Sequence, residues 1–248
     1  MLYTVTIICC YNSTKELESM LLPSFNNCGY NNKNLILINT KEEGFKSAAE
    51  AYNKTIEQRE HEIGDIIVFC HQDIAFSNGG FINTLVEEFK NNPKQIIGFA
   101  GITSSGTVVS NLKYRKSDKY ITRYRVQEKT LVCSVDECCF AITKNNFLKM
   151  EFDKKTCNHW HLYAVDLCYN ALSHDISSYV IPDIIYHKED ETSGQKTDNN
   201  FIYCMWHLIN KYRDRFPRIY APCYICSTNP LIGGFKLLKT YIKNIIKR

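Results

Sequence analysis

A series of continuous apolar runs, each followed by a stretch with helical periodicity, is the feature that most constrains this chain. The runs cover residues 4–10, 35–39, 65–70 and 96–101, and helical patterns follow the first three near residues 17–25, 44–60 and 81–91. Runs that are apolar throughout indicate strands covered on both faces. We therefore predict an α/β fold with a mostly parallel central sheet, flanking helices and right-handed crossovers.

The second half of the chain is less regular. Residues 104–125 are polar, residues 131–134 and 138–143 resemble strands, residues 159–172 resemble a helix, and residues 179–187 form an extended run. A charged loop at 189–200 precedes two predicted helices at 201–215 and 234–247. We predict a main domain over residues 1–190 and a C-terminal loop and helical extension over residues 191–248.

Cysteine usage and the N-terminus indicate the compartment. The chain has 12 Cys, and its first residues lack a basic segment followed by a long apolar core. We therefore expect a cytoplasmic protein with reduced thiols. Cys223 and Cys226 have the spacing of half a zinc or redox site, but no second pair of this spacing accompanies them. No apolar run reaches the roughly 18–20 residues that cross a bilayer.

Charge is concentrated at the C-terminus. The net charge is +4, and residues 235–248 carry Lys236, Lys239, Lys243, Lys247 and Arg248 without an acid, so the remaining chain is close to neutral. This distribution argues against nucleic-acid binding, which needs a basic surface on the fold. Apolar residues lie between these lysines at helical spacing. The tail either makes peripheral contact with an anionic membrane or packs on the body with solvated lysines.

Polar residues stand where three predicted strands end. Tyr11 and Asn12 follow the first strand, Asn39 ends the second, and His71, Gln72 and Asp73 follow the third. Ligands of open α/β sheets bind outside the carboxyl ends of the strands. No glycine-rich phosphate loop follows the first strand, which argues against a dinucleotide-binding or P-loop fold.

The third strand end has two interpretations. His71, Gln72 and Asp73 are either a polar strand end facing solvent or part of a ligand site. Apolar residues 74–76 follow directly, so the three side chains are expected to be partly buried. A buried carboxylate is costly without a cation or donor, and this favours a site.

Four segments follow one another in the chain: TVTIICCYN at the start, AEAYN at residues 49–53, GDIIVFCHQDIAF, and HWHLYAVDLCYNAL. In this order they resemble the GT-A glycosyltransferases of family 2, and most closely a bacterial subgroup with HQD in place of the usual DxD. The resemblance covers about residues 4–187. It implies a GT-A fold and an enzyme that transfers a sugar from a nucleotide-diphosphate donor.

The resemblance also implies site residues. Asp73 matches the metal-binding acid of DxD, and His187 matches a late histidine ligand, for a divalent cation that is Mn²⁺ or Mg²⁺. The donor-binding positions that it implies are Tyr11, Asn12, Asn39, Lys46, His71, Gln72 and Asp73. His71 and Asn39 replace acids of the family, which leaves metal dependence and the donor base open.

The acceptor side follows from the same resemblance. Asp166 matches the base of an inverting transfer, although a carboxylate there also stabilises a helix start. Asp136 and Glu137 either bind acceptor hydroxyls or form a solvated turn before a strand. Trp160 either stacks on an acceptor sugar or packs in the core, and a metal site at His159 and His161 lacks identifiable partners.

The predicted function is glycosyl transfer to a glycan or lipid-linked acceptor in bacterial surface-polysaccharide synthesis. One alternative is a non-catalytic nucleotide- or sugar-binding module of the same fold. Another is a nucleotidyltransferase, but the segment CCYNSTKE supplies no basic, glycine-rich loop.

Overall fold

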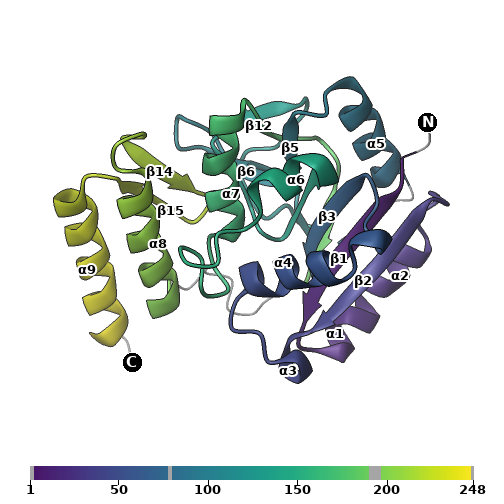
Figure 1. The fold of residues 1–248 in the computed structure, drawn as a ribbon, viewed down its shortest axis with the longest axis horizontal. Coiled ribbons are helices and arrows are strands. Elements are labelled where there is room, and N and C mark those ends of the chain that lie inside the picture. The colour runs from purple at the N-terminus through teal and green to yellow at the C-terminus, as the bar shows by residue number, and fades with distance from the viewer. Residues whose placement is uncertain (1–2, 78–79, 190–196, 247–248) are drawn as a thin grey trace.

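A seven-stranded sheet forms the centre of the computed structural model, which describes residues 3–77, 80–189 and 197–246 (Figure 1). In spatial order its strands are β2 (Lys33–Asn39), β1 (Val5–Tyr11), β3 (Ile66–His71), β11 (Cys139–Thr143), β5 (Gln95–Gly98), β12 (Ser177–Val180) and β9 (Thr130–Val132). β2, β1 and β3 are parallel, as are β5 and β12, whereas β11 and β9 are antiparallel to their neighbours. The predicted α/β fold with a mostly parallel sheet is confirmed.

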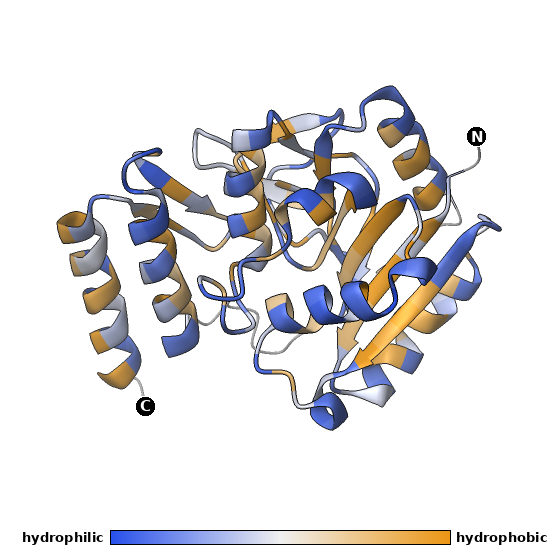
Figure 2. Ribbon diagram, in the orientation of Figure 1, coloured by the Kyte–Doolittle hydropathy of each residue, from blue (hydrophilic) through white to orange (hydrophobic). Residues whose placement is uncertain are grey.

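Helices cover both faces of this sheet, which explains why its inner strands are apolar throughout. One apolar core joins the sheet to α4 (Ala48–Gln58), α6 (Lys144–Met150) and α7 (Tyr163–Ala171). The other joins it to α1 (Thr14–Ser19), α2 (Leu21–Asn26) and α5 (Phe81–Asn91). Figure 2 shows the apolar character of the strands between these layers. Short helices lie at α3 (Thr40–Glu43), η1 (Glu60–Glu62) and η2 (Leu172–His174).

Two small sheets form where the sequence pattern is irregular. One consists of β10 (Ser134–Val135), β6 (Ala100–Ile102) and β7 (Val108–Ser110), and the other of β4 (Ile74–Phe76), β13 (Ile185–His187) and β8 (Lys113–Tyr114). The polar segment 104–125 thus contains two short strands. The second sheet is important for the site. It pairs β4, which follows β3 directly, with β13, which ends at His187.

The C-terminal part contains a hairpin that the sequence did not predict. It lies between α8 (Asn199–Tyr212) and α9 (Pro230–Ile246), and consists of β14 (Arg218–Ala221) and β15 (Tyr224–Ser227). Cys223 lies in its turn and Cys226 in its second strand. All 12 cysteines of the chain are free in the structure.

The boundary predicted at residue 190 and most of the loop predicted at 189–200 lie outside the described residues. On the far side of that boundary, α8 contributes Phe201, Cys204, Met205, Leu208 and Ile209 to the core that contains α7. α9 lies beside α8 at one end of the molecule (Figure 1). Among the helices of residues 3–77, 80–189 and 197–246, none is long and apolar enough to cross a membrane.

Candidate functional site

The polar ends of β1, β2 and β3 meet at one edge of the sheet. Tyr11 pairs with Asn39 across β1 and β2, and Cys10 pairs with His71 across β1 and β3. The strands are parallel, so their carboxyl ends open on the same side, which is where ligands of such sheets bind. The fold thereby brings together residues that lie far apart in the sequence.

A cavity of about 400 Å³ opens at this edge. Its lining includes five residues expected at the site: Tyr11, Asn12, His71, Gln72 and Trp160. It also includes residues that the analysis of the sequence did not assign to a site, among them Thr40, Lys41, Phe45, Tyr52 and Tyr163. A cavity of this size with polar groups among aromatic rings is typical of a small-molecule site.

The side chain of Gln72 fixes the loop after β1. Its Oε1 accepts hydrogen bonds from the backbone N–H groups of Asn12 and Ser13, each at 2.9 Å, and its Nε2 donates to Asn12 Oδ1 at 3.0 Å and to Glu16 Oε2 at 3.3 Å. The carboxamide is therefore fully occupied by protein groups. Gln72 shapes one wall of the cavity by holding Asn12 in place.

His71, Asp73 and His187 form a cluster beside the cavity. One potential ligand atom from each lies within 4.8 Å of the others. Strand pairing produces this arrangement, because β13 runs antiparallel to β4 with His187 opposite Ile74, and the Lys188 N–H donates to the Asp73 carbonyl oxygen at 2.9 Å. His187 thus comes to lie against Asp73, with 3.5 Å between Nε2 and Oδ2.

The chemistry of this cluster fits a divalent cation. Asp73 Oδ1 is buried and has no hydrogen-bond partner among the described residues. His187 Nδ1 lies 2.9 Å from the Lys188 carbonyl oxygen, which leaves Nε2 directed toward Asp73. Burial lowers the pKa of His71, and the carboxylate of Asp73 only partly offsets this. Neutral imidazoles and one carboxylate are the ligand types that bind first-row divalent ions.

An acidic pair lies on the other side of His71. Asp136 and Glu137 precede β11, and the His71 N–H donates to the Cys138 carbonyl oxygen at 2.9 Å, so the pair reaches the same sheet edge. Both acids line a second cavity of about 260 Å³ together with His161. Asp136 Oδ1 accepts from the Cys138 N–H at 2.9 Å, as in the turn that was considered for this pair.

Glu137 has an unusual environment within this pair. Its Oε1 is buried without a hydrogen-bond partner among the described residues. Its pKa is raised to about 8, chiefly by burial and also by the carboxylate of Asp136, although the backbone N–H groups at the start of α7 partly offset both effects. A carboxyl group with this pKa is protonated at neutral pH and becomes a carboxylate that can accept a proton as the pH rises through about 8.

Asp166, the expected base, lies elsewhere. Its side chain is only 3% exposed and lines none of the cavities described in this section. Lys211 Nζ lies 2.8 Å and 2.9 Å from its two oxygens, and Tyr212 Oη donates to Oδ1 at 2.8 Å. Its carboxylate thus joins α7 to α8. Both carboxylate oxygens of Asp166 thus have protein partners from α8.

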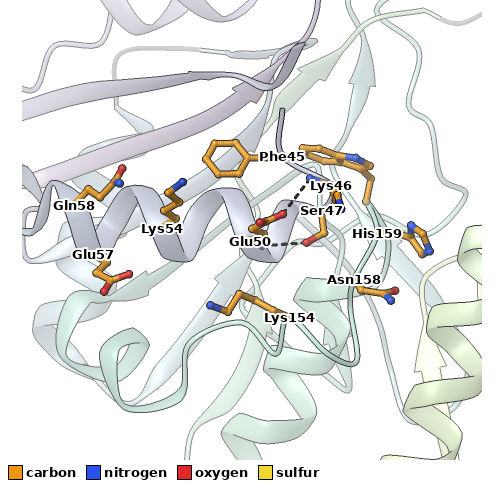
Figure 3. A pocket seen from close by; sticks show the side chains of 11 residues that line it. Phe45, Lys46, Ser47, Glu50, Lys54, Glu57, Gln58, Lys154, Asn158 and His159 are labelled. Carbon is orange, nitrogen blue, oxygen red and sulfur yellow. Dashed lines mark hydrogen bonds between the residues drawn. The ribbon is translucent and has the colours of Figure 1, made fainter. Parts of the chain in front are cut away.

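The remaining predicted residues surround the cavities. Asn39 caps α3 by accepting from the Lys41 N–H at 3.3 Å. Lys46 lines a larger open cavity of about 1010 Å³ along α4 (Figure 3). In this cavity Lys54 points toward Phe45, and Lys154 lies near the helix. Trp160 lines both this cavity and the one at the strand ends, and it is 38% exposed, which excludes simple core packing.

Comparison with solved structures identifies the class of fold. A GalNAc-T7 structure with UDP, GalNAc and Mn²⁺ matches with a TM-score of 0.56 at 11% identity, over 86% of this chain and 49% of that one. The mannosyltransferase PcManGT from Pyrobaculum calidifontis, in complex with GDP-Man and Mn²⁺, matches with a TM-score of 0.58 at 9% identity, over 86% and 64%. TarS (1–349) from S. aureus matches with 0.53 at 10% identity, over 83% and 64%.

These likenesses show that the fold is that of GT-A glycosyltransferases, as the resemblance implied. The chain spans less than two thirds of the length of each of these three structures. A comparison with curated proteins found no match.

A family match then identifies the chain more closely. The family described as "Glycosyltransferase like family" matches residues 7–192, about three quarters of the 248 residues. The chain belongs to this family. The match includes Asp73, His187 and the Asp136–Glu137 pair, and it ends before α8 and α9.

Proposed function

We propose that the protein transfers a glycosyl group from a nucleotide-diphosphate sugar to a hydroxyl of a glycan or lipid-linked acceptor, assisted by Mn²⁺ or Mg²⁺. The observation that carries this proposal is the His71, Asp73 and His187 cluster at the cavity that His71 lines. The Asp136–Glu137 pair of the second cavity directly precedes Cys138, whose carbonyl oxygen accepts from the His71 N–H. One cavity suits the nucleoside of the donor and the other suits the acceptor. The nucleotides and Mn²⁺ in the GalNAc-T7 and PcManGT structures support the same assignment.

The donor subsite is the cavity at the ends of β1, β2 and β3. Tyr11 offers aromatic surface to a nucleobase, while Asn12 and Lys41 offer polar contacts. The buried rings of Tyr52 and Tyr163 form the floor of this cavity. Gln72 keeps the Asn12 loop in position for binding. Asn39 and Lys46 lie at the margin of this subsite, and we retain them as donor contacts that form when the α3 region meets the ligand.

His71, Asp73 and His187 would hold the cation. When bound, it supplies positive charge that stabilises the departing nucleoside diphosphate. Two imidazoles in the set favour Mn²⁺ over Mg²⁺, because Mg²⁺ prefers oxygen ligands.

Glu137 is the proton acceptor in this proposal. The acceptor oxygen forms a bond to the anomeric carbon, the bond from that carbon to the diphosphate oxygen breaks, and the hydroxyl proton passes to the Glu137 carboxylate. Its unpartnered Oε1 and its place in the acceptor cavity support this role. Asp166, the base implied by the resemblance, has both oxygens occupied by Lys211. Inversion at the anomeric carbon rests on the resemblance, as does a place in bacterial surface-polysaccharide synthesis.

A non-catalytic module is the second candidate. The ion pair of Asp166 with Lys211 favours this candidate, because a chain that had lost its base would keep the nucleotide cavity and lose turnover. The two candidates differ in one measurable property, since both bind nucleotide and only the transferase releases nucleoside diphosphate from a nucleotide sugar.

Calorimetry with UDP, GDP, dTDP and CDP, each with and without Mn²⁺, tests the donor and metal subsites together. We expect one nucleotide to bind preferentially, Mn²⁺ to strengthen its binding, and both Asp73→Asn and His187→Gln to abolish the strengthening. His174→Gln, in η2 outside the cluster, is the matched control. Binding that is unaffected by Mn²⁺ and by both variants would refute the metal assignment. Nucleotide binding without release of diphosphate from any nucleotide sugar would favour the module.

A further inference from the structure

α9 is attached to the body along a narrow face. Its buried residues are Gly233 and Leu237, and Thr240 accepts or donates a hydrogen bond at 2.9 Å with the Tyr224 hydroxyl. Gly233 allows the closest approach, because a Cβ there would lie 2.3 Å from the Ser227 carbonyl oxygen. One helix face therefore packs on the hairpin and α8, and the rest faces away.

The outward face of α9 is apolar, which reverses the usual arrangement of a surface helix. At 100° per residue, six large residues fall on one stripe opposite Gly233 and Leu237. They are Leu231, Phe235, Leu238, Ile242, Ile245 and Ile246, and their exposed fractions run from 47% to 84%. Figure 2 shows these apolar positions along α9 at the end of the molecule. We call these six residues the α9 stripe.

Basic residues border the α9 stripe. Lys239 and Lys243 lie along one side of it, whereas Lys236 turns back to the body, where its ammonium lies 4.4 Å from the Tyr224 ring centre. The sequence after Asp214 contains no acidic residue. The segment that contains the stripe thus carries positive charge without an acidic residue of its own.

An aromatic residue of α8 lies beside the stripe. Trp206 is 40% exposed, and a Cβ on Gly234 of α9 would lie 3.0 Å from its ring. Tyrosine and tryptophan are favoured at membrane–water interfaces, because their rings combine apolar area with a polar edge.

We propose that the α9 stripe lies in the plane of an anionic lipid bilayer, with its apolar side chains at the headgroup–acyl boundary and Lys239 and Lys243 among anionic headgroups. A helix with one apolar face and a lysine border has this preferred position. The positive charge beside the α9 stripe favours a lipid bilayer over a second copy of the chain as the partner that covers the stripe. A symmetric contact would bring two acid-free, lysine-bearing helices together, whereas an anionic surface supplies the missing negative charge.

Vesicle co-sedimentation of the full chain tests this proposal without any donor or turnover, so its outcome is independent of the proposed function. We expect binding to vesicles of phosphatidylcholine with about one phosphatidylglycerol in three lipids, weaker binding to phosphatidylcholine alone, and weakening by salt. Phe235→Ser with Ile242→Ser should lower the partition at least about tenfold. Lys239→Gln with Lys243→Gln should lower it about fivefold per lysine on anionic vesicles only.

Leu131→Ser with Leu148→Ser is the matched control, because both residues are exposed apolar residues on other elements. The control should bind like the wild type, and circular dichroism of all variants should match. Absence of wild-type binding to the anionic vesicles would overturn the proposal. Sedimentation equilibrium that finds a dimer, dissociated by the Phe235 and Ile242 changes, would overturn it in favour of a second copy.

Discussion

Replacing Glu137 with glutamine removes a carboxylate from the acceptor cavity and preserves the size of the side chain. If Glu137 accepts the hydroxyl proton, turnover should fall by about 10²–10⁴, which equals about 3–5 kcal/mol in activation free energy. Thermal stability should be unchanged or slightly higher, since burial already disfavours the charged form of this residue. The expected effect is therefore on chemistry and not on folding.

Asp166→Asn should lower thermal stability and leave turnover per folded molecule unchanged. The change removes a charge that contacts Lys211 at 2.8 Å and leaves Asp153, at 2.9 Å, as the carboxylate beside that lysine. Breaking a buried pair costs about 3–5 kcal/mol, and we expect about 3 kcal/mol because Asp153 remains. At about 2–4 °C per kcal/mol for a chain of this length, the Tm should fall by about 6–12 °C. Turnover per folded molecule should stay near the wild-type value.

The assay combines two measurements on each variant. Release of nucleoside diphosphate from the nucleotide sugar selected by calorimetry gives turnover, and circular dichroism gives Tm. Asp153→Asn is the control for stability, because Asp153 contacts the same residue, Lys211, and lines none of the cavities described above. The reasoning is refuted if Asp166→Asn loses about a hundredfold in turnover at an unchanged Tm while Glu137→Gln stays active.

Three further predictions concern pH, the β1 loop and the packing of α9. Because the pKa of Glu137 is raised to about 8 and a base works in its deprotonated form, kcat/KM should rise as the pH passes through about 8, and a flat profile would count against this base. Gln72→Ala leaves the N–H groups of Asn12 and Ser13 without their acceptor and should weaken nucleotide binding about fivefold to thirtyfold by calorimetry, whereas unchanged affinity would exclude a shaping role. Gly233→Ala places a methyl group against Ser227 and should lower the free energy of unfolding by about 1–3 kcal/mol in chemical denaturation. Lys239→Ala is the neutral comparison, and equal denaturation midpoints for the two variants would disprove the close contact.

The local pattern of apolar and polar residues was sufficient to predict the central sheet and one edge of the site. Strands buried on both faces are apolar throughout, so β1, β2 and β3 were recognisable, and α5 was predicted with the bounds that it has. Polar residues at the ends of parallel strands converge by geometry, and four of those predicted, Tyr11, Asn12, His71 and Gln72, line the cavity. Tyr52 was visible only as an apolar position of α4, because nothing in a helix pattern distinguishes a cavity wall from core.

Contacts between distant segments were not predictable from pattern. A strand of two residues, such as β8, covers a single alternation of its side chains, which is too little to be recognised as a pattern in the sequence. Asp166 stands in an apolar helical stretch, and the sequence does not reveal that Lys211 and Tyr212 of another helix meet its carboxylate. His71 was assigned to the donor and not to the metal, although side chains two residues apart past a strand end, as in His71 and Asp73, can point the same way.

The pairing of β4 with β13 has a consequence for how the protein matures. Side chains alternate along a strand, so a slip of one residue in this three-residue ladder would turn His187 to the opposite face and leave Asp73 with one imidazole neighbour. A nascent chain that has emerged only as far as β4 lacks this neighbour, so capture of the proposed ion would await the arrival of β13. Affinity for a divalent cation would then report completed folding, and misregistered molecules would be separable from native ones on that basis alone.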